Sequence, residues 1–288
     1  MNAVRHYIVR RLLGAVPVLL GISLLAFVLA QLSPGDPAEI MLEAAGTGMP
    51  SAEEVAALHS YLGLDQPAYV QYGLWLWRIL HGDGGISYHL GMPVFTVLLA
   101  RLPVTVMLAA ASLCWAAVGG IGLGLLMARM RGTWAAMMLH GVAQVMLATP
   151  SFLTAILLIL IFGVWLHVLP TNGVDTAAGY LLPSFALALV TLAMTAQLLD
   201  AQLREALAYL YAQTARLRGL SEGRVPLTYA LPNALVPVTA MLGNFAAAVL
   251  GGAIIVETVF ALPGIGSLAL DAIHYRDYPL LQGYVLFL

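Results

Sequence analysis

The sequence predicts an all-α protein that crosses a lipid bilayer several times. Hydrophobic side chains make up 61% of its 288 residues and charged side chains only 9%, whereas about a quarter of the residues in soluble globular proteins are charged. The mean hydropathy is +0.91. Five apolar runs are long enough to cross roughly 30 Å of hydrocarbon as helices. Lipid must therefore surround much of the chain, and a soluble fold is excluded.

The apolar runs set the order of the expected membrane helices. The first run follows Arg5, Arg10 and Arg11, as the core of a signal peptide does, but it exceeds the roughly 7–15 residues of such a core. We therefore interpret it as a retained anchor. A sixth run begins near Pro279 and reaches Leu288 after about ten residues, too few to cross the bilayer, so the chain either ends within this helix or continues beyond it. The five longer runs are residues 12–31, 103–128, 134–166, 181–199 and 237–256.

The third run has 33 residues, enough for one long helix or for two short spans. If it crosses once, nine of the twelve Arg lie on one side of the membrane and three on the other. If it crosses twice, the Arg-rich segment 200–232 lies outside, against the tendency of positive residues to stay in the cytoplasm. We therefore predict one helix, kinked at Pro150 by a missing hydrogen bond, and a cytoplasmic N-terminus. The nine are Arg5, Arg10, Arg11, Arg129, Arg131, Arg204, Arg216, Arg218 and Arg224, and the three are Arg78, Arg101 and Arg276.

The chain divides into an N-terminal segment with the first helix (1–31), an outer segment (32–102) and a membrane core (103–288). The outer segment has 71 residues, enough for a small extracytoplasmic subdomain. Within the core, segment 200–232 is expected to form a cytoplasmic helical hairpin. Gly219 suits the end of its first helix and Ser221 the start of its second.

Several chemistries are excluded or disfavoured by the residues present. No Lys occurs among the twelve cationic residues, so the chain has neither a Walker A phosphate loop nor a lysine nucleophile or base. A single Cys, Cys114, forms no internal disulfide or cysteine zinc cluster. The seven His are scattered, and no HExxH motif, GxSxG motif or carboxylate pair occurs within a run. We expect no enzymatic site, no metal cage, no cofactor and no nucleic-acid partner.

Polar and methionine residues inside the runs are the candidates for a translocation path. Glu257 is the only acid near the membrane core, and it is either functional or, as we favour, an interfacial residue at the outer end of the fifth run. The amide and hydroxyl residues either bond between helices or line a path. The methionines fit core filling better. The candidates are Gln144, Met146, Thr149, Met194, Thr195, Gln197, Asn244 and Glu257.

The predicted hairpin contains the most specific motif of the chain. Residues 213–219 read Gln-Thr-Ala-Arg-Leu-Arg-Gly, and Leu231-Pro232 follows after eleven residues. This resembles the coupling loop of binding-protein-dependent ABC importer permeases, whose usual form is Glu-Ala-Ala, three residues and Gly, with Leu-Pro at this spacing. Gln213 and Thr214 replace the usual Glu and the first Ala, and this departure resembles the peptide and nickel branch of these importers. A basic cytoplasmic loop alone explains the arginines but not the Gly and the Leu-Pro. The expected coupling residues are Gln213, Thr214, Ala215, Arg216, Arg218, Gly219, Leu220, Ser221, Leu231 and Pro232.

Further motifs along the chain, taken together and in order, resemble the first permease subunit of dipeptide, oligopeptide and nickel importers. They are Arg10-Arg11, Pro34-Gly35-Asp36-Pro37, residues 62–67 with Gln71-Tyr72, residues 149–152, 233–237, 257–260, 263–266 and 276–279.

The resemblance implies a type I ABC importer transmembrane domain with about six helices in a bacterial inner membrane. It also implies a second homologous permease subunit, two ATP-binding subunits and an extracytoplasmic solute-binding protein as partners. The short 167–180 connection and the segment around Trp75 and Trp77 favour nickel or a small metal-chelate as solute, with di- or oligopeptides as the other class. The alternative is a stand-alone secondary transporter driven by an ion gradient. Such a protein predicts charged relays within spans and inverted repeats, and neither is evident.

Overall fold

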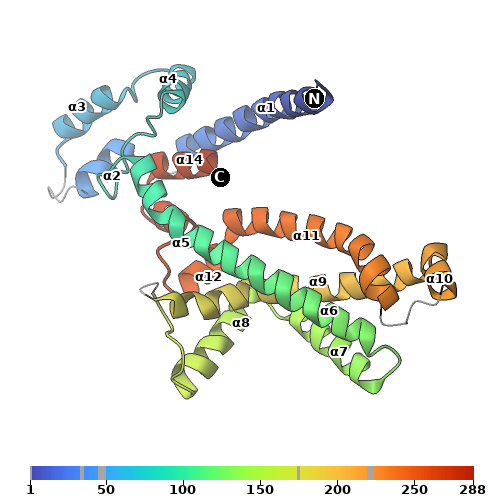
Figure 1. The fold of residues 1–288 in the computed structure, drawn as a ribbon. Helices are drawn as coiled ribbons and strands as arrows, with labels where there is room; N and C mark the ends of the chain where they lie inside the picture. Colours follow the sequence, from blue (N-terminus) through green and yellow to red (C-terminus); the bar gives the residue numbers. More distant parts are fainter. Residues whose placement is uncertain (1, 33–35, 45–49, 174–175, 219–223) are drawn as a thin grey trace. The chain divides into compact units, whose positions relative to one another are not determined.

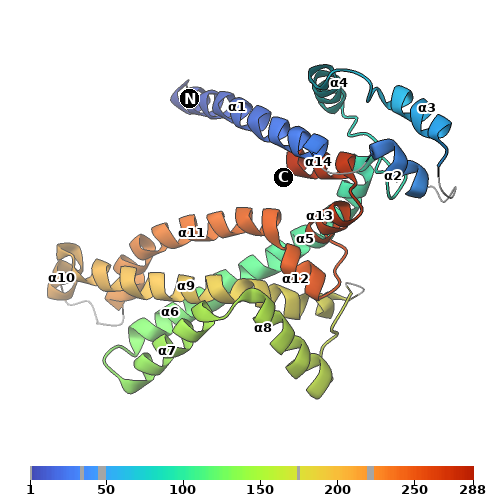
Figure 2. The same ribbon diagram turned by 180° about the vertical axis from the view of Figure 1, so that it is seen from behind.

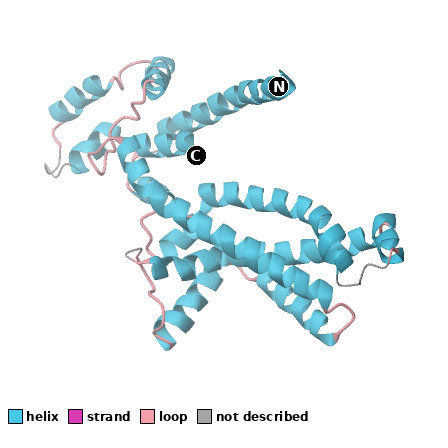
Figure 3. Ribbon diagram, viewed as in Figure 1, coloured by secondary structure: helices cyan, strands magenta, loops and turns pink. Residues whose placement is uncertain are grey.

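The computed structural model describes residues 2–32, 36–44, 50–173, 176–218 and 224–288 (Figure 1). Every named element in these ranges is helical, and one isolated β-bridge joins Ile86 and Pro93 (Figure 3). The predicted all-α class is therefore confirmed. The chain forms two compact units, one of residues Met1–Leu102 with Leu268–Leu288 and the other of residues Pro103–Ser267.

In the first unit, α1 (Asn2–Leu32) lies beside α14 (Tyr278–Phe287), as Figures 1 and 2 show. Most described side chains of α1 are exposed and apolar, as expected of a helix whose solvent is lipid. Ser23 of α1 shares a hydrogen bond of 2.9 Å with the Tyr72 hydroxyl, and the Phe27 and Tyr72 rings meet edge to face. These contacts join α1 to the segment that follows it.

That segment contains α2 (Pro37–Ala44), α3 (Ala52–Leu62) and α4 (Ala68–Leu80). Local sequence signals determine both ends of α3. Ser51 and Glu54 form a reciprocal capping box at its start. Gly63 ends the helix at φ 71°, a left-handed conformation that glycine adopts without steric cost.

In the second unit, α9 (Leu181–Ala208) is the central helix (Figure 2). It packs against α6 (Gly120–Arg129), α7 (Trp134–Ala148), α8 (Ser151–Leu158) and α11 (Leu231–Gly252). Glycines on α6 allow the closest of these contacts. A Cβ at Gly124 would lie 2.8 Å from the Ala196 carbonyl oxygen, so only glycine permits this approach.

The remaining elements connect or extend these helices. A π-helical turn, η1 (Trp115–Gly119), joins α5 (Val94–Cys114) to α6, and together they form a 36-residue candidate span, Val94–Arg129. The further elements are η2 (Ile159–Trp165), η3 (Ala177–Tyr180), α10 (Leu210–Leu217), η4 (Pro226–Ala230), α12 (Ile254–Val259) and α13 (Ile265–His274). The predicted run 237–256 is divided at Ala253, between α11 and α12.

The prediction of one kinked helix over residues 134–166 is wrong in extent. Helix α7 ends at Ala148 and α8 begins at Ser151, and the helical segments on either side of the break are bent by 104°. Thr149 and Pro150 are both extended, with ψ angles of 119° and 144°. Proline disfavours the helical conformation of the preceding residue and lacks its own N–H, so the helix stops here instead of bending. The number of membrane crossings made by this pair stays a prediction.

The described residues contain four helices long and apolar enough to cross a membrane, or five if the broken pair forms one span. The four are Arg5–Val28, Val94–Arg129, Ala177–Ala208 and Pro226–Leu250. They correspond to the first, second, fourth and fifth predicted runs. Helix α14 provides ten residues of the sixth.

Candidate functional site

The predicted coupling segment begins where α9 ends. Tyr209 is extended, with φ −68° and ψ 153°, and α10 follows it. The helical path resumes at Arg224 and runs through η4 into α11. Leu231 and Pro232 are the first two residues of α11, and they continue the helical path directly from η4. The predicted caps Gly219 and Ser221, with Leu220 between them, lie outside the described residues.

The described side chains of α10 are exposed. Thr214 is exposed, and its hydroxyl donates to the Leu210 carbonyl oxygen at 2.9 Å. Arg218 is exposed, and the Leu217 side chain is 89% exposed. Gln213, Ala215 and Arg216 belong to α10 by their backbone, and their side chains lie outside the described set. This helix therefore offers accessible side chains to a partner protein.

The start of α11 is anchored on α9 by an apolar core. Ala230, Ala234 and Val238 are buried against Leu199 and Leu203 of α9. Leu231 is partly buried against the same cluster, and Pro232 is exposed. Leu231 of the motif therefore packs the base of the segment against α9, and no described side chain of α10 belongs to this cluster.

Asp200, which sequence reasoning missed, lies at the base of this segment and is only 1% exposed. Its carboxylate accepts hydrogen bonds from Arg131 at 2.7 Å and from Arg204, one turn later on α9. The His140 ring nitrogen Nε2 on α7 lies 3.6 Å away. A buried carboxylate requires such partners because its desolvation is costly. Asp200 therefore ties α9 to α7 and to the turn after α6. The available signal was an acid four residues before an Arg at the end of an apolar run.

The candidates for a translocation path fall into three groups by exposure. Gln144, Met194 and Asn244 are exposed, and Met146, Thr149 and Gln197 are partly buried. The Gln197 amide nitrogen is buried without a hydrogen-bond partner among the described residues.

The other two candidates, Thr195 and Glu257, are fully enclosed. The Thr195 hydroxyl donates to the Thr191 carbonyl oxygen at 2.7 Å, and its side chain packs where a Cβ on Gly120 would lie. Neither of these two side chains faces an open surface of the chain.

Glu257, expected at the outer end of the fifth run, is fully buried within its own chain. The Thr105 hydroxyl donates to its Oε1 at 2.7 Å, and the Ser267 N–H donates to its Oε2 at 2.8 Å. The Thr105 oxygen in turn accepts the Ile265 N–H at 2.9 Å. A Cβ at Gly264 would meet the carboxylate itself, which explains that glycine. Neutral donors thus satisfy the carboxylate and join α5, α12 and the start of α13.

Comparison with known proteins identifies the family. Residues 120–288 match the family described as binding-protein-dependent transport system inner membrane component. Residues 4–109 match the N-terminal family of such membrane components. The chain belongs to this family of importer permeases. The recognition made from the coupling motif is therefore confirmed.

Two relatives of the permease are similar over nearly its whole length. A putative peptide transport system permease protein of Brucella suis biovar 1 (strain 1330) is 39% identical over 289 residues, which cover 98% of this chain and 91% of that protein. The glutathione transport system permease protein GsiC of Escherichia coli (strain K12) is 36% identical over 281 residues, covering 98% and 90%.

These findings establish the class of protein. The chain is a multi-pass inner-membrane transport subunit with the type I ABC importer fold, and permeases of this kind work with ATP-binding and substrate-binding partners. The names of the relatives do not support the preference for nickel or a metal-chelate. No group of three or more His, Cys, Asp and Glu side chains arranged for a metal ion occurs in the part of the chain that the structure describes.

Proposed function

We propose that this chain is the translocation subunit of an ATP-driven importer of di- and oligopeptides. The observation that supports this most directly is the family match over almost the entire chain, together with the coupling motif at residues 213–232. In this proposal it pairs with a second homologous permease, two ATP-binding subunits and an extracytoplasmic binding protein. The names of both relatives favour peptides over nickel as the solute.

The proposed orientation places the N-terminus and segment 200–232 in the cytoplasm and segment 32–102 outside. It rests on the nine Arg that a single crossing of the third run gathers on one side, against three on the other. Under this orientation, Asp200 lies near the cytoplasmic end of α9 and Glu257 lies toward the outer side.

We assign ATPase contact to α10 and the residues that follow it, Gly219, Leu220 and Ser221. Without Lys the chain has no phosphate-binding loop of its own, so the energy of ATP must reach it through this contact. Asp200 holds α9 to Arg131 and is close to His140 of α7. A displacement of α10 would therefore move α9 together with α7 and Arg131, because the contacts of Asp200 hold them together.

The solute path is proposed to run along the exposed candidates of the second unit, Gln144, Met194 and Asn244. These side chains are open on this chain and would face the second permease subunit. The unpaired amide nitrogen of Gln197 would find its acceptor at the same interface. Thr195 and Glu257 are excluded from this path because their own chain encloses them.

The test is uptake by the complete importer in proteoliposomes, with its binding protein and a labelled dipeptide. We expect uptake that requires ATP and persists when ion gradients are collapsed. Uptake driven by an ion gradient without ATP would establish the secondary-transporter alternative. Nickel uptake that unlabelled peptides do not compete with would replace the peptide assignment by the metal one.

A further inference from the structure

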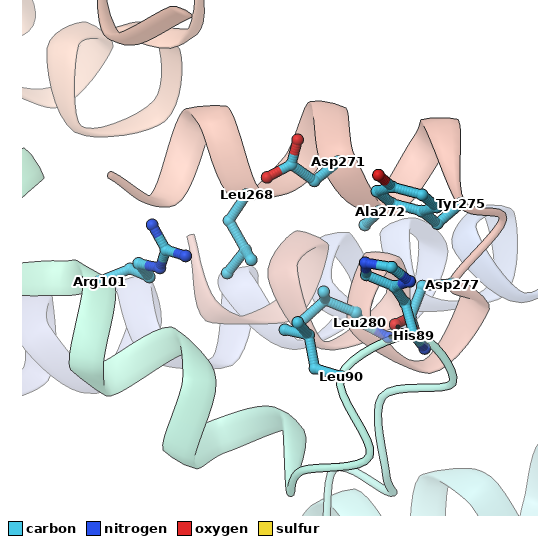
Figure 4. A pocket seen from close by; sticks show the side chains of 9 residues that line it. All are labelled: His89, Leu90, Arg101, Leu268, Asp271, Ala272, Tyr275, Asp277 and Leu280. Carbon is cyan, nitrogen blue, oxygen red and sulfur yellow. Dashed lines mark hydrogen bonds between the residues drawn. The ribbon is translucent and has the colours of Figure 1, made fainter. Parts of the chain in front are cut away.

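A small pocket in the first unit combines opposite charges with an apolar floor (Figure 4). It has a volume of about 190 Å³ and lies between the start of α5, residues 89–90, α13 and the start of α14. Leu90, Leu268 and Leu280 form its apolar surface. Arg101 extends from α5 toward α13, on which Leu268 and Asp271 stand (Figure 4).

Arg101 is partly buried in this pocket and has no counterion of its own. Among the described residues, no carboxylate forms an ion pair with it and no acceptor forms a hydrogen bond with it. A guanidinium beside leucine side chains loses hydration, so an unpaired one is costly unless an external anion completes it. Its planar fork matches a carboxylate in two parallel hydrogen bonds.

The other polar groups define which anion fits. Asp277 is fully buried and already accepts the Ser87 hydroxyl and the His89 N–H, so it is committed to holding the 87–90 loop. The His89 and Tyr275 rings are stacked, with centroids 3.6 Å apart and planes 6° apart, and they close one side. Asp271 is exposed, and its negative charge repels a second negative charge on a ligand.

We propose that this pocket is a subsite for the terminal carboxylate of a peptide passing from the binding protein to the membrane path. Arg101 binds the carboxylate, and Asp271 disfavours peptides whose last residue is acidic. The volume is below the roughly 300–1,000 Å³ of sites that enclose a whole ligand, so the pocket holds one end group only. The proposal rests on the peptide-import function and on the outward orientation of this unit.

The first experiment compares two forms of one peptide in the complete importer with saturating binding protein. One form ends in a free carboxylate and the other in a carboxamide. Arg101→Gln should lower the ratio of acid to amide uptake about fivefold relative to wild type, because one partly exposed charged hydrogen-bond pair is lost. The binding protein is the same throughout, so its own preference cancels between variants. The matched control is Arg78→Gln, an exposed Arg of the same unit outside this pocket, which should leave the ratio unchanged.

The second experiment uses Asp271→Asn, which keeps the side-chain volume and removes the charge. This variant should raise the uptake of a peptide with an acidic last residue about threefold relative to a neutral one. If Arg101 and Asp271 only paired with each other, both variants would instead lower the uptake of all peptides equally.

Equal loss in both variants, or an unchanged acid-to-amide ratio in Arg101→Gln, overturns the subsite and leaves peptide import standing. If Arg101→Gln fails to assemble, the Asp271→Asn result decides alone, and an unchanged preference there overturns the proposal. A wild-type importer that takes up neither peptide form contradicts the proposed function itself.

Discussion

Two carboxylates are almost completely buried in the Pro103–Ser267 unit, and different kinds of donor hold them. Asp200 accepts from two guanidinium groups whose side chains are 38% and 58% exposed. Glu257 accepts from a hydroxyl and a backbone N–H, both from neutral groups inside the fold. The first arrangement is electrostatic and open to solvent on one side, whereas the second depends on steric fit. We infer that the Asp200 region can rearrange during transport and that the Glu257 region is a fixed part of the frame.

The largest expected effect concerns membrane orientation, which decides whether Asp200 lies on the cytoplasmic side and Glu257 toward the outer side. In a Cys114→Ser background, a membrane-impermeant thiol reagent should label Ser60→Cys and should not label Ser221→Cys. The reason is the distribution of Arg, nine on one side and three on the other. The opposite labelling pattern would place the Asp200 region on the outer side and the Glu257 region toward the cytoplasm. The coupling assignment would then be wrong.

The steric character of the Glu257 region predicts the largest loss of stability. Gly264→Ala places a Cβ against the carboxylate, and the enclosed turn has no free space to absorb it. We expect a cost of about 2–3 kcal/mol in the free energy of unfolding, measured in detergent. Gly243→Ala is the matched control, because nothing lies within 4 Å of a Cβ there. Equal stability of the two variants would show that the fit around Glu257 is loose.

The electrostatic character of the Asp200 region predicts a smaller and salt-dependent loss. Asp200→Asn should cost about 1–2 kcal/mol at low ionic strength, since Arg131 and Arg204 can turn toward water. At about 1 M salt, where the screening length is about 3 Å, the difference from wild type should shrink. Glu257→Gln should show the same loss at both salt concentrations. If the loss of stability in Asp200→Asn does not change with salt, the stabilisation of Asp200 is not electrostatic and does not differ in kind from that of Glu257.

A third carboxylate, Glu54, is fully exposed and gives the smallest effect. Hydrogen bonds from the Ser51 backbone N–H and hydroxyl lower the pKa of Glu54 below its ordinary value of 4.5. Because the pKa of Glu54 is lower in the folded than in the unfolded chain, the ionised carboxylate stabilises the fold at pH values above the unfolded-state pKa. This stabilisation is lost as the pH falls through the folded-state pKa. Glu54→Gln should therefore lower the thermal unfolding temperature slightly at pH 6, and the difference should shrink as the pH falls below 4.5 and through the lowered pKa.

The control for this measurement is Glu53→Gln, since its side chain makes no hydrogen bond among the described residues. That variant should match wild type at both pH values. A pH-independent difference for Glu54→Gln would mean that the capping box acts by shape alone.

Sequence reasoning predicted the elements of the fold better than its contacts. Hydropathy predicted the helices because lipid requires long apolar runs, and Pro150 marked the break because proline acts on its immediate neighbours. The angle of 104° at that break depends on packing and was not predictable.

The contacts of the buried carboxylates could not be predicted either, because they join residues far apart in the sequence. Asp200 meets Arg131 across 69 residues, and Glu257 meets Thr105 across 152. Nothing in the periodicity of one segment specifies a partner in another. Gly264 belonged to a recognised motif, but its reason, the space taken by the Glu257 carboxylate, became visible only in three dimensions.

We infer that this permease receives the energy of ATP through α10 and the residues that follow it, Gly219, Leu220 and Ser221. The most direct test is peptide-stimulated ATP hydrolysis and peptide uptake by the complete importer carrying Gly219→Trp. We expect both activities to be lost while the complex still assembles, because the predicted left-handed cap tolerates glycine far better than tryptophan. Gly219→Asn, which also adopts that conformation, should retain them. Unchanged ATP hydrolysis and uptake in Gly219→Trp would contradict the coupling role.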